Sequence, residues 1–445
     1  MLMVSARNTT SLLGVAAVSV VTLLLLISAG QVPLAARPPV DSAVLTSVDA
    51  AQPATQYKYE ALYEFCDSSG CPDIPNGDLI FDAAGNLYGT TFEGGDAACG
   101  LGCGTVFQLS PKADGTWKLT TIFKFDGRDG AYPAAGLVMD VAGNLYGTTS
   151  GDTGLGDGTV FELAPRKDGA WKYTALVKFT GKNGSDPEAR LILGPAGKLY
   201  GTTSAGGDSA CDGSGCGTVF QLAPAANGKW KLTTLFKFND TDGANPYAAL
   251  IFDAAGNLYG TASGGGKFGE GTVFKLSPAK GSTWTLTTLF NFNGADGAGP
   301  RGSVVFDADG NLYGTTVGGG GRGFGTVFKL SPQDNGGWRH TTLVTFDIAN
   351  GSQPTAGLIF DPDGNLYGNA NDGRFGIGIV FRLSPQANGK WKETTLLTFD
   401  GANGSGPAGG LLRDATGDLY GSASVEGKRS GGVVFELSPA RGKKQ

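Results

Sequence analysis

The chain has 445 residues, and its net charge of −6 gives no electrostatic footprint for nucleic acid. It contains 75 Gly, which are costly inside helices, so the composition disfavours a helical fold. Aromatic residues make up 10% of the chain and provide enough apolar surface to exclude disorder. The composition therefore indicates many short strands joined by Gly-rich turns.

The first 30 residues have the organisation of a secretory signal. Arg7 precedes an apolar run at residues 12–29, and small residues at 28–30 end it. The run is also long enough to span a bilayer, so an uncleaved N-terminal anchor is the alternative and the one membrane contact we expect. Residues 31–55 are rich in Pro and small residues and predict a flexible linker. We therefore expect an extracytoplasmic protein that is periplasmic, secreted or attached to the cell surface.

Six cysteines form three local pairs, each with its partners four or five residues apart. An even number of cysteines in an exported chain predicts disulfides, here three small loop bridges. Zinc is the alternative, but it usually requires CxxC knuckles with His partners, and this chain has one His. The predicted bridges join Cys66 to Cys71, Cys99 to Cys103 and Cys211 to Cys216.

One repeat of about 54 residues occupies the rest of the chain, marked by seven copies of LYG. In each copy an LIFD-like strand, a DAAGN-like turn and an LYGT strand are followed by a Gly-rich loop, a GTVFKLSP strand and a strand such as TWTLTTLFNF. Four strands in each repeat, with no helical period, predict the blade of a propeller. The fold expected is all-β, a seven-bladed β-propeller. The LYG tyrosines are at 88, 146, 200, 259, 313, 367 and 420.

The two ends of the repeat region predict how the ring closes. The last copy ends at VVFELSPARGKKQ and lacks a fourth strand, whereas residues 57–65 align without gaps with the fourth strand at 117–125. We predict that this N-terminal strand completes the last blade, which removes two exposed sheet edges. An open β-solenoid is the alternative, and the divided blade argues against it. The propeller then covers 56–440, with a short basic tail at 441–445, and we expect a monomer.

The pattern GNLYGTT, a Gly-rich loop and then GTVFKLSP resembles the GloVer-type tandem repeat of exported bacterial proteins. The resemblance covers residues 57 to 440, and seven copies make it specific. It implies an extracytoplasmic propeller with no established biochemical activity. The FDADGNLYG turn also resembles NHL-repeat propellers, but their shorter period fits less well.

A residue that is present in every blade is expected to build the blade, which removes most candidate motifs. DADGN at 307–311 and DPDGN at 361–365 resemble the start of a calcium loop, but the other copies and the absent downstream ligands favour a plain turn. Gly-rich segments such as 263–271 lie between strands without GK[ST], so we interpret them as loops rather than phosphate sites.

At six of the seven junctions between blades, Asp or Asn precedes Gly, and Pro follows three residues later; Ser69-Gly70 replaces the pair at the closing junction. An Asx side chain that caps a turn explains this pattern without a ligand. A ring of carboxylates near the axis could instead hold a cation, close to Asp129, Asp242 and Asp296. We expect no other cofactor or metal.

Catalysis has little support in the sequence, and we assign no catalytic residue. His340 is the one histidine, and it lies on a predicted outer strand, far from the axis. The alternative is an extracytoplasmic carbohydrate-active enzyme that uses acidic residues near the propeller axis, because many Asp and Glu lie on loops.

Departures from the repeat are concentrated in the loops between the second and third strands. Blades 1 and 3 have longer loops, and these contain the last two cysteine pairs. The loop charges divide into an acidic arc over blades 1 to 3 and a more basic arc over blades 4 to 7. Ordinary solvated loops are one interpretation; the other is a recognition face on a non-catalytic binding or surface-structural module, for an extracytoplasmic protein or glycan. Its candidate residues are Glu93, Asp96, Asp152, Asp157, Asp208, Asp212, Lys267, Arg322, Arg374, Lys428 and Arg429, with Phe92, Phe268, Phe324 and Phe375 as apolar contacts.

Overall fold

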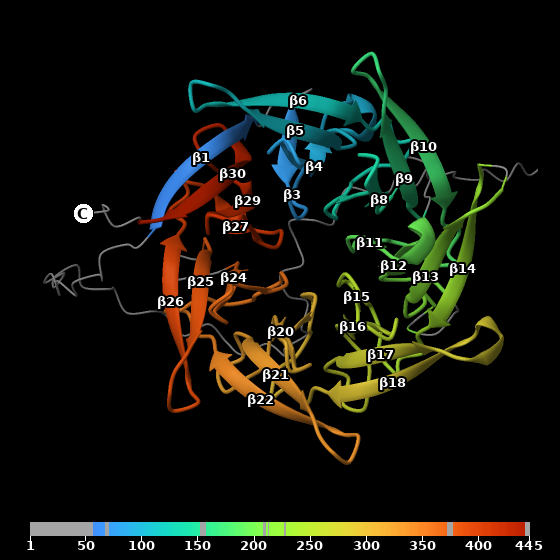
Figure 1. Ribbon diagram of the computed structural model, residues 1–445, viewed down its shortest axis with the longest axis vertical. Coiled ribbons are helices and arrows are strands. Elements are labelled where there is room, and N and C mark those ends of the chain that lie inside the picture. The colour runs from blue at the N-terminus through green and yellow to red at the C-terminus, as the bar shows by residue number, and fades with distance from the viewer. Residues whose placement is uncertain are drawn as a thin grey trace, which may run out of the picture. The chain divides into compact units, whose positions relative to one another are not determined.

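The computed structural model describes residues 57–66, 71–151, 157–207, 211, 213–226, 228–371 and 377–440. These residues form seven antiparallel sheets around a central axis, which confirms the predicted seven-bladed β-propeller (Figure 1). We number the blades 1 to 7 in the order of their LYG copies. The predicted signal or anchor, the linker and the basic tail lie outside the described residues. Within these ranges no helix has the length and apolarity to cross a membrane.

Each blade contains four strands, which run in order from the axis outwards. The innermost strands are β3 (Ile80–Phe81), β7 (Val138–Met139), β11 (Ile192–Leu193), β15 (Ile251–Phe252), β19 (Val305–Phe306), β23 (Ile359–Phe360) and β28 (Leu412–Arg413). The second strands are β4 (Leu87–Gly94), β8 (Leu145–Thr149), β12 (Leu199–Thr203), β16 (Leu258–Ala262), β20 (Leu312–Thr316), β24 (Leu366–Ala370) and β29 (Leu419–Val425).

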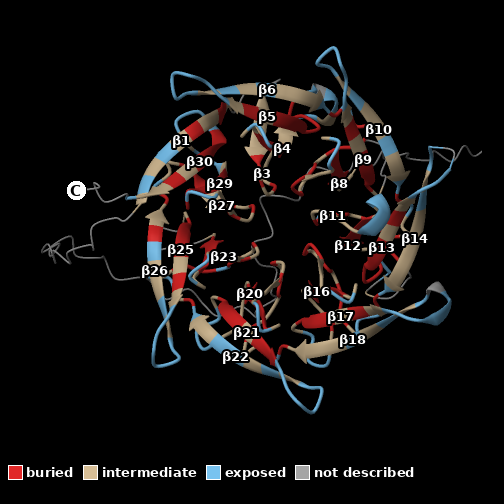
Figure 2. Cartoon of the chain, viewed as in Figure 1, coloured by how far each residue is buried: buried red, intermediate tan, exposed pale blue. Residues whose placement is uncertain are grey.

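The second and third strands are the most deeply buried, and the fourth strands form the outer edge (Figure 2). The third strands are β5 (Thr105–Pro111), β9 (Thr159–Pro165), β13 (Thr218–Pro224), β17 (Thr272–Pro278), β21 (Thr326–Pro332), β25 (Ile379–Pro385) and β30 (Ser430–Pro439). The fourth are β6 (Trp117–Lys124), β10 (Trp171–Lys178), β14 (Trp230–Lys237), β18 (Trp284–Asn291), β22 (Trp338–Thr345), β26 (Trp391–Thr398) and β1 (Tyr57–Cys66). Smaller elements are strands β2 (Pro72–Pro75) and β27 (Ser405–Pro407) and three 3-10 turns, η1 (Ala97–Cys99), η2 (Pro195–Gly197) and η3 (Lys280–Ser282).

The ring closes through the divided blade, as predicted. Strand β1 pairs antiparallel with β30, with Tyr57 opposite Pro439 and Ala61 opposite Phe435. Blade 7 is therefore built from both ends of the described chain (Figure 1). Tyr57 also takes the place that Trp holds in the other blades, and its hydroxyl lies 3.4 Å from that of Tyr367 in blade 6.

The core consists of buried clusters between neighbouring blades. At each junction, the Phe that follows the fourth strand packs against the Phe of the next blade's third strand, for example Phe125 against Phe161 with ring centroids 5.2 Å apart. The same pair closes the ring, between Phe65 and Phe107. The glycine of LYG makes room for these rings, because a Cβ on Gly147 would lie 2.5 Å from Phe161. The repeat is thus an apolar joint that recurs around the ring.

The DAAGN-like turns are held by one aspartate. In blade 4 the Asp253 carboxylate accepts backbone N–H groups of Ala255 and Asn257, both at 2.9 Å, together with the Asn257 amide and the Tyr259 hydroxyl. Asp307 and Asp361 make the same bonds, which confirms the prediction of a turn.

All three predicted disulfides are present, and the described residues contain no free cysteine. The first bridge lies where the chain leaves β1 at the ring closure, and the other two lie in the longer loops of blades 1 and 3. This pairing confirms the disulfide prediction over the zinc alternative. The bonds join Cys66 to Cys71, Cys99 to Cys103, and Cys211 to Cys216.

The loops between second and third strands lie on the same side of the ring as the connections between blades. Antiparallel connectivity within each blade places them there. Bridges such as Ala131 to Gly151 show that the two kinds of loop lie side by side. We call this side the loop face, and it carries the longer loops of blades 1 and 3.

Candidate functional site

Backbone hydrogen bonds join the loops of the loop face to one another. The N–H of Tyr132 donates to the Cys103 carbonyl of blade 1 at 2.9 Å, and its own carbonyl accepts Ser150 N–H of blade 2. This bridging residue precedes Pro in every blade and has a φ between 52° and 63°. A left-handed backbone costs a residue other than Gly on the order of 1–2 kcal/mol, yet five blades place a side chain there. The residues are Ile74, Tyr132, Asp186, Asn245, Gly299, Gln353 and Gly406.

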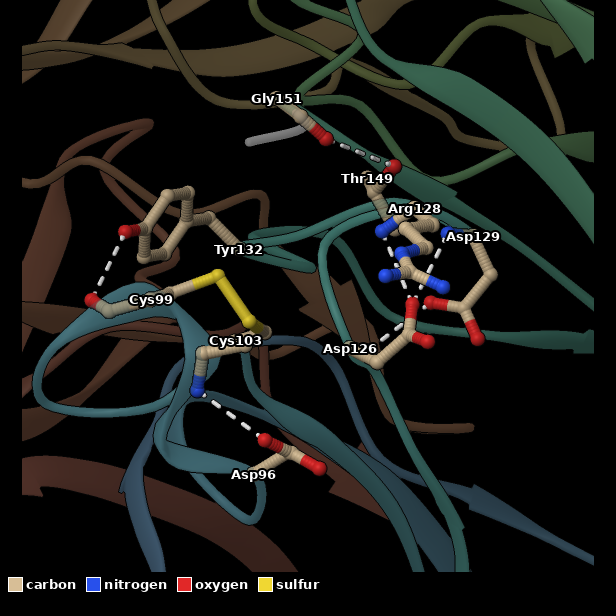
Figure 3. The surroundings of a disulfide bond; sticks show 10 residues. Asp96, Cys99, Cys103, Asp126, Arg128, Asp129, Tyr132, Thr149 and Gly151 are labelled. Atoms are coloured by element: carbon tan, nitrogen blue, oxygen red, sulfur yellow. Dashed lines mark hydrogen bonds between the residues drawn. A yellow bond between two sulfur atoms is a disulfide. The ribbon is translucent and has the colours of Figure 1, made fainter. Parts of the chain in front are cut away.

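The first long loop is fixed against the next blade (Figure 3). The Tyr132 hydroxyl donates to the Cys99 carbonyl at 3.4 Å, and the ring of Phe92 stacks on Tyr132 with centroids 5.1 Å apart. The Cys103 N–H donates to the Asp96 carbonyl. The disulfide between Cys99 and Cys103 and these contacts restrain the loop.

The second long loop, in blade 3, is restrained in the same way. Its disulfide joins Cys211 to Cys216, and Cys216 is fully buried. The Cys216 carbonyl accepts the N–H of Asn245 from the next connection at 2.9 Å. This bond is the equivalent of the one between Tyr132 and Cys103 in the first long loop. Both long loops are therefore attached to the next blade through a cysteine backbone.

The Asx-Gly connections cap their own turns. Asp129 accepts the Asp126 N–H at 3.0 Å, and Asp126 in turn accepts the Arg128 N–H at 2.8 Å. Burial raises the pKa of Asp129 to about 6. Asp242 and Asp296 cap the equivalent turns of other blades, and no three His, Cys, Asp or Glu in the described ranges are grouped to hold a metal. A cation near these residues stays a prediction that the geometry does not test.

The predicted basic residues that the structure describes lie on the loops of blades 4, 5 and 7 rather than in one cluster. Arg322 pairs with Asp347 of its own blade, and Lys428 lies 3.6 Å from Glu64 at the ring closure. Lys267 lies over the ring of Phe268, 5.0 Å from its centroid. Arg429 is exposed beside Lys428 on the same loop of blade 7, and Glu93 and Asp96 lie in the first long loop. Arg374, Phe375, Asp152, Asp208 and Asp212 lie outside the described residues.

The predicted aromatic contacts divide into packed and exposed rings. Phe324 packs partly buried against the core between blades 5 and 6, and Phe92 is covered by Tyr132. Phe268 is 51% exposed, so it is the one of these three rings that is free to contact a ligand.

A second set of residues, which was not predicted, lies at the axial end of the loops. The residue after each connection's Pro is partly or fully exposed in all seven blades, whereas that Pro and the second residue after it are buried. Each precedes an innermost strand, and these strands surround the axis (Figure 1). The residues on either side of this position are similar in every repeat, whereas the residue at the position itself varies. This variation is the signal in the sequence by which the set could have been found. The residues are Asn76, Ala134, Glu188, Tyr247, Arg301, Thr355 and Ala408.

Three consecutive blades place their residue from this set in one cluster. The Arg301 guanidinium lies over the ring of Tyr247, 5.0 Å from its centroid. Surrounding protein replaces much of the solvation of Glu188 and raises its pKa to about 7, with the charge of Asp186 adding to the rise and Arg301 opposing it. Burial also raises the pKa of Asp186, and so does the charge of Asp157. We call Asp186, Glu188, Tyr247 and Arg301 the axial cluster.

An ion pair joins blades two apart near the same axis. Arg190 Nε lies 3.1 Å from Asp78 Oδ2, and Asp78 Oδ1 accepts the Gly410 N–H of blade 7 at 2.6 Å. Gly136 of the intervening blade leaves room for this contact, since a Cβ there would lie 2.6 Å from the Asp78 carbonyl oxygen. At these two positions before the innermost strand, blades 1, 3, 4 and 5 thus carry a charged or aromatic side chain near the axis. Blades 2 and 7 carry Ala at the first position and Gly at the second.

His340 lies on outer strand β22, away from the axis, as predicted. Its ring stacks on Phe290 of blade 4 with centroids 4.6 Å apart, and burial lowers its pKa. The site is a blade-to-blade contact and not a catalytic arrangement.

The fold and loop face together define a seven-bladed β-propeller whose irregular features lie on one side and at the axis. The chain belongs to the Gloeobacter/Verrucomicrobia repeat family, whose model matches residues 44–213, 100–301 and 212–435. A search of curated proteins gives no match to this sequence.

Two solved structures show the same fold at low sequence identity. A structure described as an ancestral GH74 enzyme is 12% identical with a TM-score of 0.55; the match covers 87% of this chain and 52% of that one. A structure of the mitotic checkpoint complex is 15% identical with a TM-score of 0.51, covering 92% and 99% of the two chains. The propeller thus spans about half the length of the GH74 enzyme, and these likenesses concern the fold alone.

Proposed function

We propose that the protein is an exported, non-catalytic propeller that binds an extracytoplasmic ligand on its loop face. The observation that carries this proposal is the gathering of irregular features on one side of a regular ring: two disulfide loops, an uneven charge distribution and the axial cluster. Three disulfides support export, because such bonds persist in oxidising compartments. The apolar N-terminal segment supports it as well.

Rigidity of the loop face supports recognition. A loop that is already ordered loses little entropy when it binds, so restrained loops favour affinity. Disulfides restrain the loops of blades 1 and 3, and at six of the seven junctions the left-handed residue donates its N–H to a carbonyl of the preceding blade's loop. Those backbone conformations cost stability, which favours a role for the side chains that they display.

A binding screen with matched charge changes tests this proposal. The full chain, purified from the exported fraction, is screened on glycan and protein arrays, and the variant Arg322→Ala/Lys428→Ala is compared with the control Lys172→Ala/Lys392→Ala. Both variants remove two basic side chains, but the control pair lies exposed on outer strands β10 and β26. We expect binding to weaken at least tenfold only in the loop-face variant. Equal binding by all three proteins contradicts a loop-face site.

Mass spectrometry tests the export part of the proposal. We expect the exported protein to contain no free thiols and to begin after residue 28. Free thiols in all three pairs contradict an oxidising location, and an intact N-terminus favours the membrane anchor.

One observation supports a second candidate, glycoside hydrolysis. A general acid needs a carboxyl that is protonated near neutral pH, and Glu188, with a pKa raised to about 7, lies close to the second carboxyl of Asp186. Turnover of a polysaccharide that Glu188→Gln abolishes, with binding retained, would establish the enzyme. Binding without turnover favours the recognition module.

A further inference from the structure

Building on the proposed binding function, we propose that the axial cluster is the subsite for a neutral, hydroxyl-rich saccharide. Glu188, Tyr247 and Arg301 supply the polar contacts and one aromatic ring, and Asp186 lies beside them. The inference names a ligand class and a place for it, both of which the loop-face proposal leaves open.

The fold does not need these side chains. The same position carries Ala134 in blade 2 and Ala408 in blade 7, with the same buried neighbours on either side. The blades are joined instead by the Phe pairs and by threonine hydroxyls such as Thr261, which donates to the Gly302 carbonyl of the next blade at 3.2 Å. Bulky polar groups in three consecutive blades are therefore additions to the scaffold.

The polar groups of the axial cluster are available to hydrogen-bond a ligand. Within the described part of the chain, the Glu188 carboxyl, the Tyr247 hydroxyl and the Arg301 guanidinium make no hydrogen bond to another residue, and Arg301 makes no ion pair within 4.0 Å. By contrast, Asp78 and Arg190, two residues further along their connections from these positions, are bonded to each other. The cluster thus presents unused donors and acceptors beside a structural ion pair that already uses its own.

The chemistry of the cluster matches a sugar better than a charged polymer. A carboxylate and a guanidinium each present two polar atoms in one plane, a geometry that fits two neighbouring hydroxyls. The amphipathic ring of Tyr247 can pack on the apolar side of a pyranose. Two carboxyls and one guanidinium place both signs of charge in the cluster. A polyanion would be repelled by Asp186 and Glu188, and a polycation would be repelled by Arg301.

Titration calorimetry with alanine variants tests the subsite. The probes are cellohexaose, mannohexaose and xylohexaose, with hexameric polygalacturonate and chitosan and one acidic and one basic peptide as charged and protein probes. Glu188→Ala, Tyr247→Ala and Arg301→Ala are compared with Thr355→Ala, which changes the same position in blade 6. We expect a neutral hexasaccharide to bind, each cluster variant to weaken it at least tenfold, and the control to stay within twofold.

Stability and pH measurements complete the test. Because Ala occurs at this position in two blades, all four variants should unfold within about 2 °C of the parent protein, so that weaker binding reports lost contacts. The groups that face Glu188 are Asp186, Tyr247 and Arg301. A neutral sugar should bind with less than threefold change between pH 6 and pH 8, whereas a uronate should bind more tightly at pH 6, where the Glu188 carboxyl is more protonated.

Each outcome separates this inference from the proposed function. Binding that Arg322→Ala/Lys428→Ala weakens and the cluster variants leave unchanged overturns the saccharide subsite but keeps a loop-face ligand. Preference for a peptide or a charged oligosaccharide also overturns the neutral-sugar assignment. Failure of every probe to bind overturns the subsite, and the proposed function then fails only if the array screen finds no loop-face ligand either.

Discussion

His340 shows how one position of the repeat joins neighbouring blades. Its ring stacks on Phe290 of blade 4, and in blade 2 the corresponding Tyr173 stacks on Phe123 at the same 4.6 Å. The Nε2 atom of His340 is buried without a hydrogen-bond partner among the described residues. A neutral, unpaired imidazole in an aromatic stack contributes packing and carries a cost of desolvation.

Replacing His340 with Leu should stabilise the protein most strongly at acidic pH. The pKa of His340 is lowered in the folded state, so below about pH 6.5 the unfolded chain binds more protons and stability falls as pH falls. Leu fills this position in blades 1, 3 and 4 and removes the unpaired group, for a gain of about 1 kcal/mol or more. Thermal unfolding of both proteins between pH 5 and pH 8 measures the difference, and a gain that does not change with pH contradicts the assignment.

Among the elements, the turn between the first two strands depends on a single carboxylate. Asp253→Gly should destabilise the protein by about 1–3 kcal/mol, because four donors lose their acceptor. Blade 3 already carries Gly194 at this position, so the variant should fold. Denaturant unfolding checks the value, with Asp309→Ala as the control, since that exposed side chain lies in an equivalent turn. Equal stabilities of the two variants would show that the network is dispensable.

Loss of a loop disulfide should increase mobility mainly in that loop and in the residues that contact it. Cys99→Ser/Cys103→Ser opens a bridge of sequence separation 4, for which chain entropy predicts a global cost of about 2 kcal/mol. Tyr132 and Phe92 should lose order together, because Tyr132 is hydrogen-bonded to this loop and Phe92 stacks on Tyr132. Amide exchange should rise in residues 92–104 and at residues 131 and 132, and stay unchanged in blade 5. A protection pattern identical to that of the parent protein contradicts the restraint.

Local patterns predicted the elements well and the axial cluster not at all. Strand ends, turns and disulfides depend on residues a few positions apart, so Asp253, Asn257 and Tyr259 show their relationship within one copy. Glu188, Tyr247 and Arg301 meet because three blades converge on an axis; they share one variable position of the repeat, but no pattern within a single copy joins them. The charged loop residues that the structure describes lie on the predicted face, but their separate partners, such as Asp347 for Arg322, depend on side-chain geometry.

The whole ring depends on the strand that the two ends of the chain share. Seven copies and a missing last strand predicted the closure, and the register of β1 with β30 confirms it. Removal of residues 57–66 should strongly destabilise the domain, because it takes Phe65 out of the core and leaves β30 with an open edge. Thermal unfolding and light scattering should show a lower transition and aggregation. Lys58→Ala, an exposed change in the same strand, is the control, and an unchanged transition after the deletion contradicts the closure.

The pairing of β1 with β30 also determines when the ring can close during synthesis and folding. The first strand of the propeller must wait unpaired until residues near Pro439 exist, since its partner is the last strand to be made. Contacts between such distant segments slow folding, because the chain must lose loop entropy before the contact forms. A circular permutant that places residues 57–66 after Pro439 would turn this contact into a hairpin. It should refold faster than the parent protein and reach the same ring.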